Sequence, residues 1–221
     1  MGKAIVEMSD GRTTSMLLRC GVVAGPLYIA LGAGQILLRD GFDMRLHALS
    51  LLSNGEYGWI QVANFLISGI LVVAGAIGVR RQLRHGSGGT WLPILLMAWG
   101  IGLIGSGIFR ADPGMGFPPG TPMETEFTRD GMLHFVFGAI AFYTLIAACL
   151  VAARRFARLG RRGWLWYSIA SGVGFFVVFA GIASGSSSGA LMLVFYAAVA
   201  WIWIWHSAFH ATLVGETRVP A

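Results

Sequence analysis

The stretch GWIQVANFLISGILVVAGAIGVRR, which runs from Gly58 to Arg81, decides the fold. It carries no charged side chain from Trp59 to Val79, and a pair of arginines follows at once. An apolar run of about 20 residues is long enough for a helix that crosses a hydrocarbon core about 30 Å thick. Because lipid offers backbone groups no hydrogen bonds, such a segment must be helical. The stretch therefore predicts a transmembrane helix.

Five further apolar segments of similar length flank this one. The six predicted spans are residues 15–38, 59–79, 90–109, 131–153, 164–184 and 189–210. The whole chain agrees, because 56% of its 221 residues are hydrophobic, 12% are charged and its mean hydropathy is +0.69. A soluble domain normally carries about a quarter charged residues. We therefore expect an all-α fold, a polytopic bundle of six transmembrane helices.

Positive charge is spread unevenly over the segments between the spans. Twelve of the 16 Lys and Arg residues lie on the tails, on the loops after the second and fourth spans or, for Arg19 alone, near the start of the first span. Cytoplasmic segments carry such an excess, and tryptophans, here including Trp203 and Trp205, are expected at the interfaces. This predicts the cytoplasmic membrane, with a cytoplasmic N-terminal tail (1–14), a six-helix transmembrane domain (15–210) and a cytoplasmic C-terminal tail (211–221).

Composition argues against several other classes of function. The net charge of +6 is explained by topology, and no soluble basic domain is present to bind nucleic acid, so none is expected as a partner. Cys20 and Cys149 fall inside apolar spans, so no disulfide framework is predicted. His206 and His210 have the i, i+4 spacing of a metal-binding pair. His85 is the one other predicted cytoplasmic histidine, so we favour interfacial histidines and expect neither metal nor cofactor.

Polar side chains within the spans gather toward the predicted outer ends. Ionisable and amide groups are costly in a membrane, so by default they face the bundle interior or a cavity. Convergent polar groups in an apolar bundle describe a binding site, and the alternative is a set of interhelical hydrogen bonds that only holds the bundle together. The predicted ligand-binding residues are Gln61, Asn64, Ser106, Arg110, Asp112 and His134. Tyr57, Ser68, Gln35, Asp130 and His47 lie at similar positions.

The loop GIFRADPGMGFPPGTP, from Gly107 to Pro122, is unusually rich in turn residues. Pro113 prevents the third span from continuing, and the glycines and prolines that follow turn and stiffen the chain. We expect Phe117 to pack back toward the bundle, so that the loop forms a rigid cap over an outer cavity. Arg110 could clamp a phosphate or carboxylate there, and an Arg110–Asp112 ion pair that merely ends the helix is the alternative.

Three stretches resemble a known family. They are HALSLLSNGEYGWIQVANFLISG (47–69), the loop at 107–122 and GMLHFVFGAIAFY (131–143). The sequence is similar to the uncharacterised prokaryotic membrane family called domain of unknown function 998, from the first span into the sixth. Its most specific part is the loop with Asp112, Pro113, Phe117, Pro118 and Gly120, followed by Gly131 and His134. The resemblance implies a six-span integral membrane protein and offers no established activity, cofactor or substrate.

The leading hypothesis is an outward-facing polar cavity, capped by the 110–130 loop, that binds a lipid headgroup or a small amphiphile. One alternative is a membrane-embedded enzyme acting on a lipid at the outer face, with His134 as base assisted by Asp130 or Asp112. Another is a structural subunit of a membrane complex. Membrane lipids are expected partners. An oligomer is possible through small residues that let helices approach closely, namely Gly21, Gly25, Gly102 and Ser106.

Overall fold

The computed structural model describes residues 2–84, 86–185 and 187–217, with side chains from residue 11 onward. Over these residues the chain forms six long helices and one short 3-10 helix, η1. They are α1 (Gly2–Leu38), η1 (Leu49–Ser53), α2 (Gly58–Gln82), α3 (Trp91–Ile108), α4 (Arg129–Arg158), α5 (Arg162–Ala183) and α6 (Gly189–Glu216). Each long helix contains a stretch apolar enough to cross a membrane, which in α1 begins at Gly11. The predicted all-α, six-span class is confirmed.

The helices run beyond several of the predicted ends. α4 continues through Arg154 and Arg155 to Arg158, and it ends before Gly160, whose φ of 67° a helix does not accept. α1 extends through most of the predicted tail at 1–14. The predicted ends mark where apolar side chains stop, whereas a helix stops where its backbone is interrupted. The division into tails and a transmembrane domain stays a prediction, and residues 1 and 218–221 lie outside the described residues.

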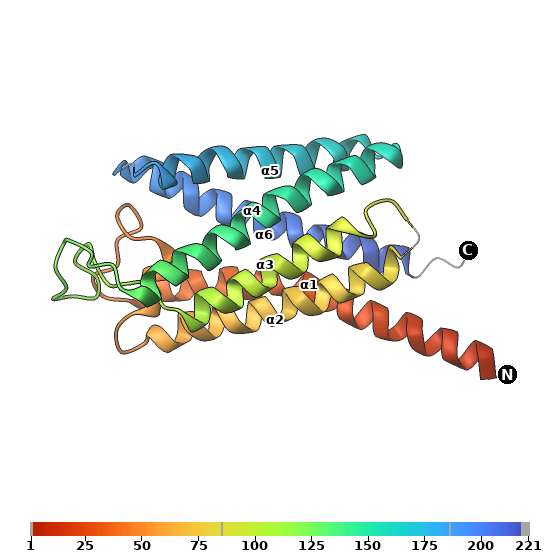
Figure 1. Ribbon diagram of the computed structural model, residues 1–221, viewed down its shortest axis with the longest axis horizontal. Helices are drawn as coiled ribbons and strands as arrows, with labels where there is room; N and C mark the ends of the chain where they lie inside the picture. Colours follow the sequence, from red (N-terminus) through yellow and green to blue (C-terminus); the bar gives the residue numbers. More distant parts are fainter. Residues whose placement is uncertain (1, 85, 186, 218–221) are drawn as a thin grey trace.

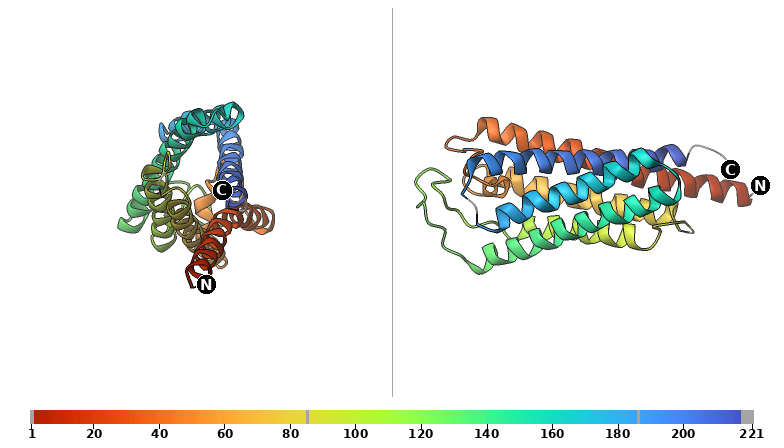
Figure 2. Two further views of the ribbon diagram at one scale, coloured as in Figure 1. Left: turned by 90° about the vertical axis from the view of Figure 1, so that its right-hand side faces the viewer. Right: turned by 90° about the horizontal axis from the view of Figure 1, so that it is seen from above.

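The helices form a closed ring. Each helix packs against its neighbours in the chain, and α6 returns to pack against α1. Figure 2 shows the ring from the end at which both termini lie. We call this the termini end, and we call the opposite end, which carries the connections 39–57 and 109–128, the loop end (Figure 1). Which end faces the cytoplasm stays a prediction.

Small residues allow neighbouring helices to approach closely. A Cβ atom on Gly25 of α1 would lie 2.7 Å from the backbone oxygen of Trp203 on α6, and one on Gly102 of α3 would lie 2.8 Å from the backbone of Ala141 on α4. Gly21 likewise faces the ring of His210. These glycines thus pack helices within one chain, and an oligomer stays a prediction.

Two apolar clusters stabilise the molecule. The larger one fills the space between the helices and includes Trp99, Trp203 and Trp205. Trp203 and Trp205 are therefore core residues rather than the interface anchors that the sequence predicted, because α6 continues past them to Glu216. The second cluster lies under the loops, where Leu51, Leu52, Ala111 and Phe117 pack together.

Candidate functional site

Gln61 and Asn64 lie on one face of α2, as predicted, and that face contacts α1. Gln35 of α1 donates from Nε2 to Oε1 of Gln61 at 2.8 Å, and Asn64 donates from Nδ2 to the backbone oxygen of Tyr28 at 3.2 Å. Ser68 donates to Oδ1 of Asn64 at 3.3 Å, and both amide side chains are fully buried. The bonds of Gln61 and Asn64 to α1 correspond to the interhelical hydrogen bonds that were the alternative to a binding site.

Asp112 anchors the start of α4. Its Oδ2 accepts from the backbone nitrogen of Thr128 at 2.8 Å, and its Oδ1 accepts from the Thr128 hydroxyl at 2.5 Å. Thr128 is the N-cap of α4, and its hydroxyl oxygen accepts in turn from the backbone nitrogen of Gly131 at 3.1 Å. A Cβ at Gly131 would overlap the Asp112 carboxylate. These hydrogen bonds, from Gly131 to Thr128 and from Thr128 to Asp112, therefore fix the 109–128 loop to the helix that follows it.

Arg110 is exposed, although it lies two residues before Asp112. Among the described residues it forms no ion pair, because both carboxylate oxygens of Asp112 are occupied by Thr128. The alternative of an Arg110–Asp112 ion pair is therefore wrong. Arg110 also does not line the interior cavity described below.

His134 closes the loop end of α3. Its Nδ1 lies 3.0 Å from the backbone oxygen of Ser106 and 2.9 Å from that of Phe109. Carbonyls at a helix C-terminus lack partners within the helix, so this contact satisfies two of them. Because both neighbours are acceptors, Nδ1 carries the proton and Nε2 is left as an acceptor. Asp130 is exposed, so no carboxylate–histidine pair forms around His134 in the part of the chain described.

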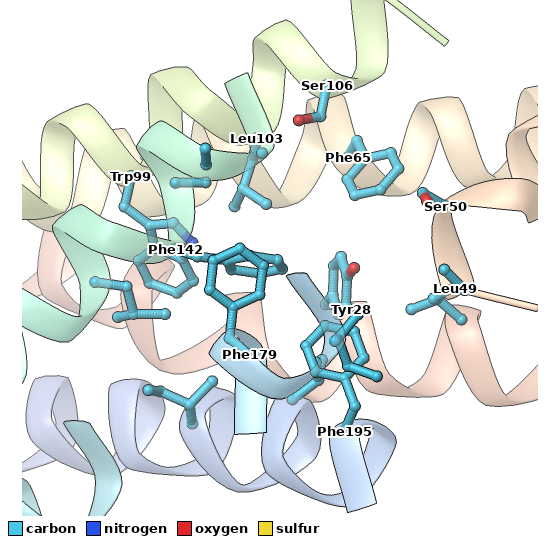
Figure 3. A pocket seen from close by; sticks show the side chains of 18 of the residues that line it. Tyr28, Leu49, Ser50, Phe65, Trp99, Leu103, Ser106, Phe142, Phe179 and Phe195 are labelled. Carbon is cyan, nitrogen blue, oxygen red and sulfur yellow. The ribbon is translucent and has the colours of Figure 1, made fainter. Parts of the chain in front are cut away.

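A cavity of about 180 Å³ lies inside the ring of helices, and Figure 3 shows most of its lining. Of the six predicted site residues, Ser106 and His134 line it. The walls are mainly apolar and aromatic, whereas the neutral polar groups come from Ser50, Ser106, His134, Tyr28 and Tyr196. None of the described lining residues is charged. The single polar cavity expected from the sequence is thus replaced by an aromatic one, since Gln61 and Asn64 face α1 and Asp112 faces Thr128.

The aromatic lining was missed by sequence reasoning. Trp99 and Trp203 both line the cavity, with their ring centroids 4.6 Å apart, and Trp203 also stacks on Tyr28 at 4.5 Å. Phe142 of α4 contacts Phe179 of α5 at 4.8 Å. These residues come from five different helices, so only their arrangement in space brings them together. The one available signal was the abundance of aromatic residues in the predicted spans.

The cover of the cavity at the loop end also differs from the expectation. The lining there comes from Ala48, Leu49 and Ser50, around the start of η1, and not from the 110–130 loop. Phe117 is fully buried, which confirms that it packs inward, but it does so against the first loop, with its ring 5.2 Å from Phe42. The 110–130 loop is therefore an outer layer over the segment that covers the cavity.

Hydrogen bonds connect these two layers and α6. His47 accepts from the backbone nitrogen of Asp43 through Nδ1, so its Nε2 carries the proton and donates to the backbone oxygen of Met115 at 2.9 Å. Tyr196 of α6 donates to the backbone oxygen of His47 at 2.7 Å. Arg39 donates to the backbone oxygen of Asn54 at 2.6 Å, and partial burial lowers the pKa of its guanidinium. The loop end is thus held closed by bonds among segments distant in the chain.

His206 and His210 are not interfacial, contrary to the expectation. Both are fully buried, with ring centroids 4.2 Å apart, because Gly21 and Gly75 leave room for the His210 ring. His210 Nδ1 lies 3.0 Å from the backbone oxygen of His206. No group of three potential metal ligands occurs among the described residues, and His85 lies outside them. The lack of a metal stays a prediction.

The fold and its cavity define the class as a multi-pass helical membrane protein with an interior cavity rich in aromatic side chains. Residues 22–212 match the family described as protein of unknown function (DUF998), and the chain belongs to that family. This confirms the resemblance found in the sequence. The matched range begins within α1 and ends within α6, and it includes every residue that lines the cavity. No curated protein and no solved structure matches the chain.

Proposed function

We propose that the protein binds a small amphiphile in the interior cavity, with the apolar part of the ligand against the aromatic walls. The polar part would lie near Ser106 and His134. The observation that carries this proposal is the chemistry of the lining, which is apolar over most of its area, rich in aromatic side chains and polar at a few neutral groups. Pockets that bind small molecules have this composition, because apolar walls give affinity and a few polar groups fix orientation.

The size of the cavity limits the part of the ligand that it encloses. Its volume is about 180 Å³, and an apolar cavity of about 150 Å³ in another protein is large enough to bind benzene. A ring or a short segment of alkyl chain therefore fits, whereas a phospholipid headgroup with two chains does not. The proposal accordingly replaces recognition of a headgroup with recognition of an apolar group.

The polar groups favour an uncharged hydrogen-bonding ligand. His134 offers Nε2 as an acceptor, since its Nδ1 is bound to the carbonyls of Ser106 and Phe109. Ser106 offers a hydroxyl, which can donate or accept. Burying a charge without a partner is costly, and the nearby Arg110 is exposed rather than part of the lining. A hydroxyl or an amide is the chemistry that this arrangement supports.

Binding is better supported than catalysis. An enzyme that used His134 as a base would gain from a carboxylate that orients the ring. The proton on Nδ1 is held by backbone carbonyls instead, and Asp112 is bound to Thr128. We therefore assign His134 the role of a hydrogen-bonding group in the site.

The test is photolabelling of the purified protein with a neutral alcohol that has sixteen carbons and carries a diazirine on its chain. In Gly138→Leu the new side chain enters the cavity, because a Cβ there has Ser106 Oγ at 3.9 Å as its nearest neighbour. Leu also favours a helix more than Gly does. We expect Gly138→Leu to lose labelling of the lining residues of α4 and α6.

The matched control is Gly174→Leu. Gly174 is exposed on α5, and a Cβ there would have no other atom within 4 Å. It changes the same residue type in the same way, away from the cavity, and should retain wild-type labelling. Equal labelling of the wild type and both variants would refute the proposal. If Gly138→Leu alone loses labelling, mass spectrometry of molecules released from the wild type but missing from Gly138→Leu would identify the natural ligand.

A further inference from the structure

We infer that the ligand enters the cavity sideways from the bilayer, between α4 and α5, and not from water through the loop end. The ligand is then an uncharged single-chain amphiphile that is dissolved in the membrane, with part of its chain left among the lipids. This inference rests on the proposed function of the same cavity. It adds the route of access and the class of ligand.

α5 contacts only part of the longer helix α4. Phe156 stacks on Trp164 near the termini end with ring centroids 5.2 Å apart, and Phe142, near the middle of α4, contacts Phe179, in the last turns of α5, at 4.8 Å. From there toward the loop end the two helices diverge, which is visible in both Figure 1 and Figure 2. The cavity lies between the two helices in this region, since Phe135 of α4 and Ile182 of α5 both line it.

Phe135 marks this mouth. It lines the cavity, yet 57% of its surface is exposed, so the cavity reaches the outside of the ring beside it. Phe135, Gly138 and Phe142 are spaced three and four residues apart, so they lie on one face of α4. The face that forms the inner wall of the cavity therefore continues to its mouth.

The mouth lies at the depth of the lipid chains. A helix rises about 1.5 Å per residue, so Phe135 and Phe142 lie roughly 9 Å and 20 Å along α4 from Arg129 at its start. The hydrocarbon core of a bilayer is about 30 Å thick, and α4 is one of the apolar spans. An opening between Phe135 and Phe142 therefore faces acyl chains and not water.

The route from water is closed by an apolar layer. Leu52 and Phe117 are both fully buried under the loops. Tyr196 donates to the backbone oxygen of His47, and Asn54 donates from Nδ2 to the backbone oxygen of Ala111 at 3.0 Å. A molecule arriving from this side would have to break these bonds and cross the cluster. Because the path from the bilayer is open and the path from water is closed, the cavity selects ligands that partition into lipid.

A lateral mouth also removes any upper limit on chain length. A closed cavity of about 180 Å³ would exclude long chains. Through an open mouth the first part of a chain fills the cavity and the remainder lies outside, beside Phe135. Long and short chains should therefore bind alike, and their relative binding should depend on the width of the mouth.

The experiment uses two diazirine alcohols, with six and sixteen carbons, added to the protein in lipid vesicles. The wild type should be labelled by both at Phe142 and Trp203. In Phe135→Trp the ratio of long-chain to short-chain labelling should fall about fivefold or more, the lower end of what overpacking costs. Phe135→Ala should keep or raise the ratio. Phe176→Trp and Phe176→Ala are matched controls, because Phe176 is 45% exposed on α5 and does not line the cavity.

Each of the other possible outcomes refutes one stated part of the inference. If the wild type is not labelled at the lining by either probe, the proposed function fails and the route fails with it. If Gly138→Leu abolishes labelling while the Phe135 variants leave the ratio unchanged, binding stands and lateral entry is wrong. If Phe117→Ala instead raises labelling by both probes, entry is through the loops. Equal labelling by a sixteen-carbon diazirine carboxylate would refute the restriction to uncharged ligands.

Discussion

His134 on α4 and Ser106 on α3 are joined by a hydrogen bond of 3.0 Å between Nδ1 and the backbone oxygen, and both side chains line the cavity. The bond therefore connects the stability of the bundle with the geometry of the site. It holds the end of α3 against the start of α4 and fixes which nitrogen of the ring is free to act as an acceptor.

His134→Ala should lower the free energy of unfolding by about 1–3 kcal/mol, because two carbonyl oxygens at the end of α3 lose their partner. It should also weaken photolabelling by the alcohol probes at temperatures at which the variant is folded. Thermal unfolding in detergent measures the first effect. Met132→Ala is the control, since Met132 lies on the same helix and is 54% exposed. An unchanged unfolding temperature in His134→Ala would contradict the assigned hydrogen bonds.

Asp112→Ala and Arg110→Ala should differ sharply, although the residues are two apart in the chain. Asp112→Ala removes two hydrogen bonds to Thr128 and should cost about 1–3 kcal/mol of stability. Arg110→Ala changes an exposed side chain and should stay within about 0.5 kcal/mol of the wild type. Photolabelling of Arg110→Ala should equal that of the wild type. A loss of labelling there would restore Arg110 as part of the ligand site.

Gly21→Ala and Gly34→Ala form a pair on α1 with opposite expected effects. A Cβ at Gly21 would overlap the His210 ring, whereas a Cβ at Gly34 would have no other atom within 4 Å. Overpacking costs about 1–3 kcal/mol, and Ala in a helix is favoured over Gly by up to about 1 kcal/mol. Gly21→Ala should thus unfold at a lower temperature than the wild type, and Gly34→Ala at the same or a higher one. The reverse order would disprove the close packing of α1 on α6.

The predicted orientation can be measured with single cysteines. Met115 is exposed at the loop end and Arg158 is exposed at the termini end. With both termini in the cytoplasm, a membrane-impermeant maleimide should modify Met115→Cys on intact cells and Arg158→Cys only after lysis. The wild type serves as the blank, because Cys149 is buried and Cys20 is half-buried within the helices. Modification of Arg158→Cys on intact cells would invert the topology.

The helices were predictable because a membrane imposes a minimum apolar length on each of them, and α2 ends close to where its apolar run meets Arg80 and Arg81. The depth of each residue in the membrane was predictable for the same reason, so the polar residues at the loop end were recognised as a group. The direction in which a side chain points around its helix axis, and so the neighbour that it meets, was not predictable. Gln61 and Asn64 were placed on one face of α2, but the sequence does not state that this face meets α1.

The interior site was hidden for a related reason. Its walls combine Tyr28, Phe142, Phe179 and Trp203, which lie far apart in the chain, and no spacing rule connects them. The burial of His206 and His210 was missed because it depends on glycines in other helices, at Gly21 and Gly75. Phe117 was the exception, because a phenylalanine set among turn residues has little to contact except the protein itself.

The ring in which each helix contacts its neighbours in the chain has a consequence for how the molecule is made. During synthesis each new helix finds its partner already inserted, so assembly can proceed in order from α1 to α5. The contact of α6 with α1 closes the ring and can form only after α6 has been made. Because Trp203 and Tyr196 of α6 form part of the cavity wall, the site comes into existence only after α6 has been inserted.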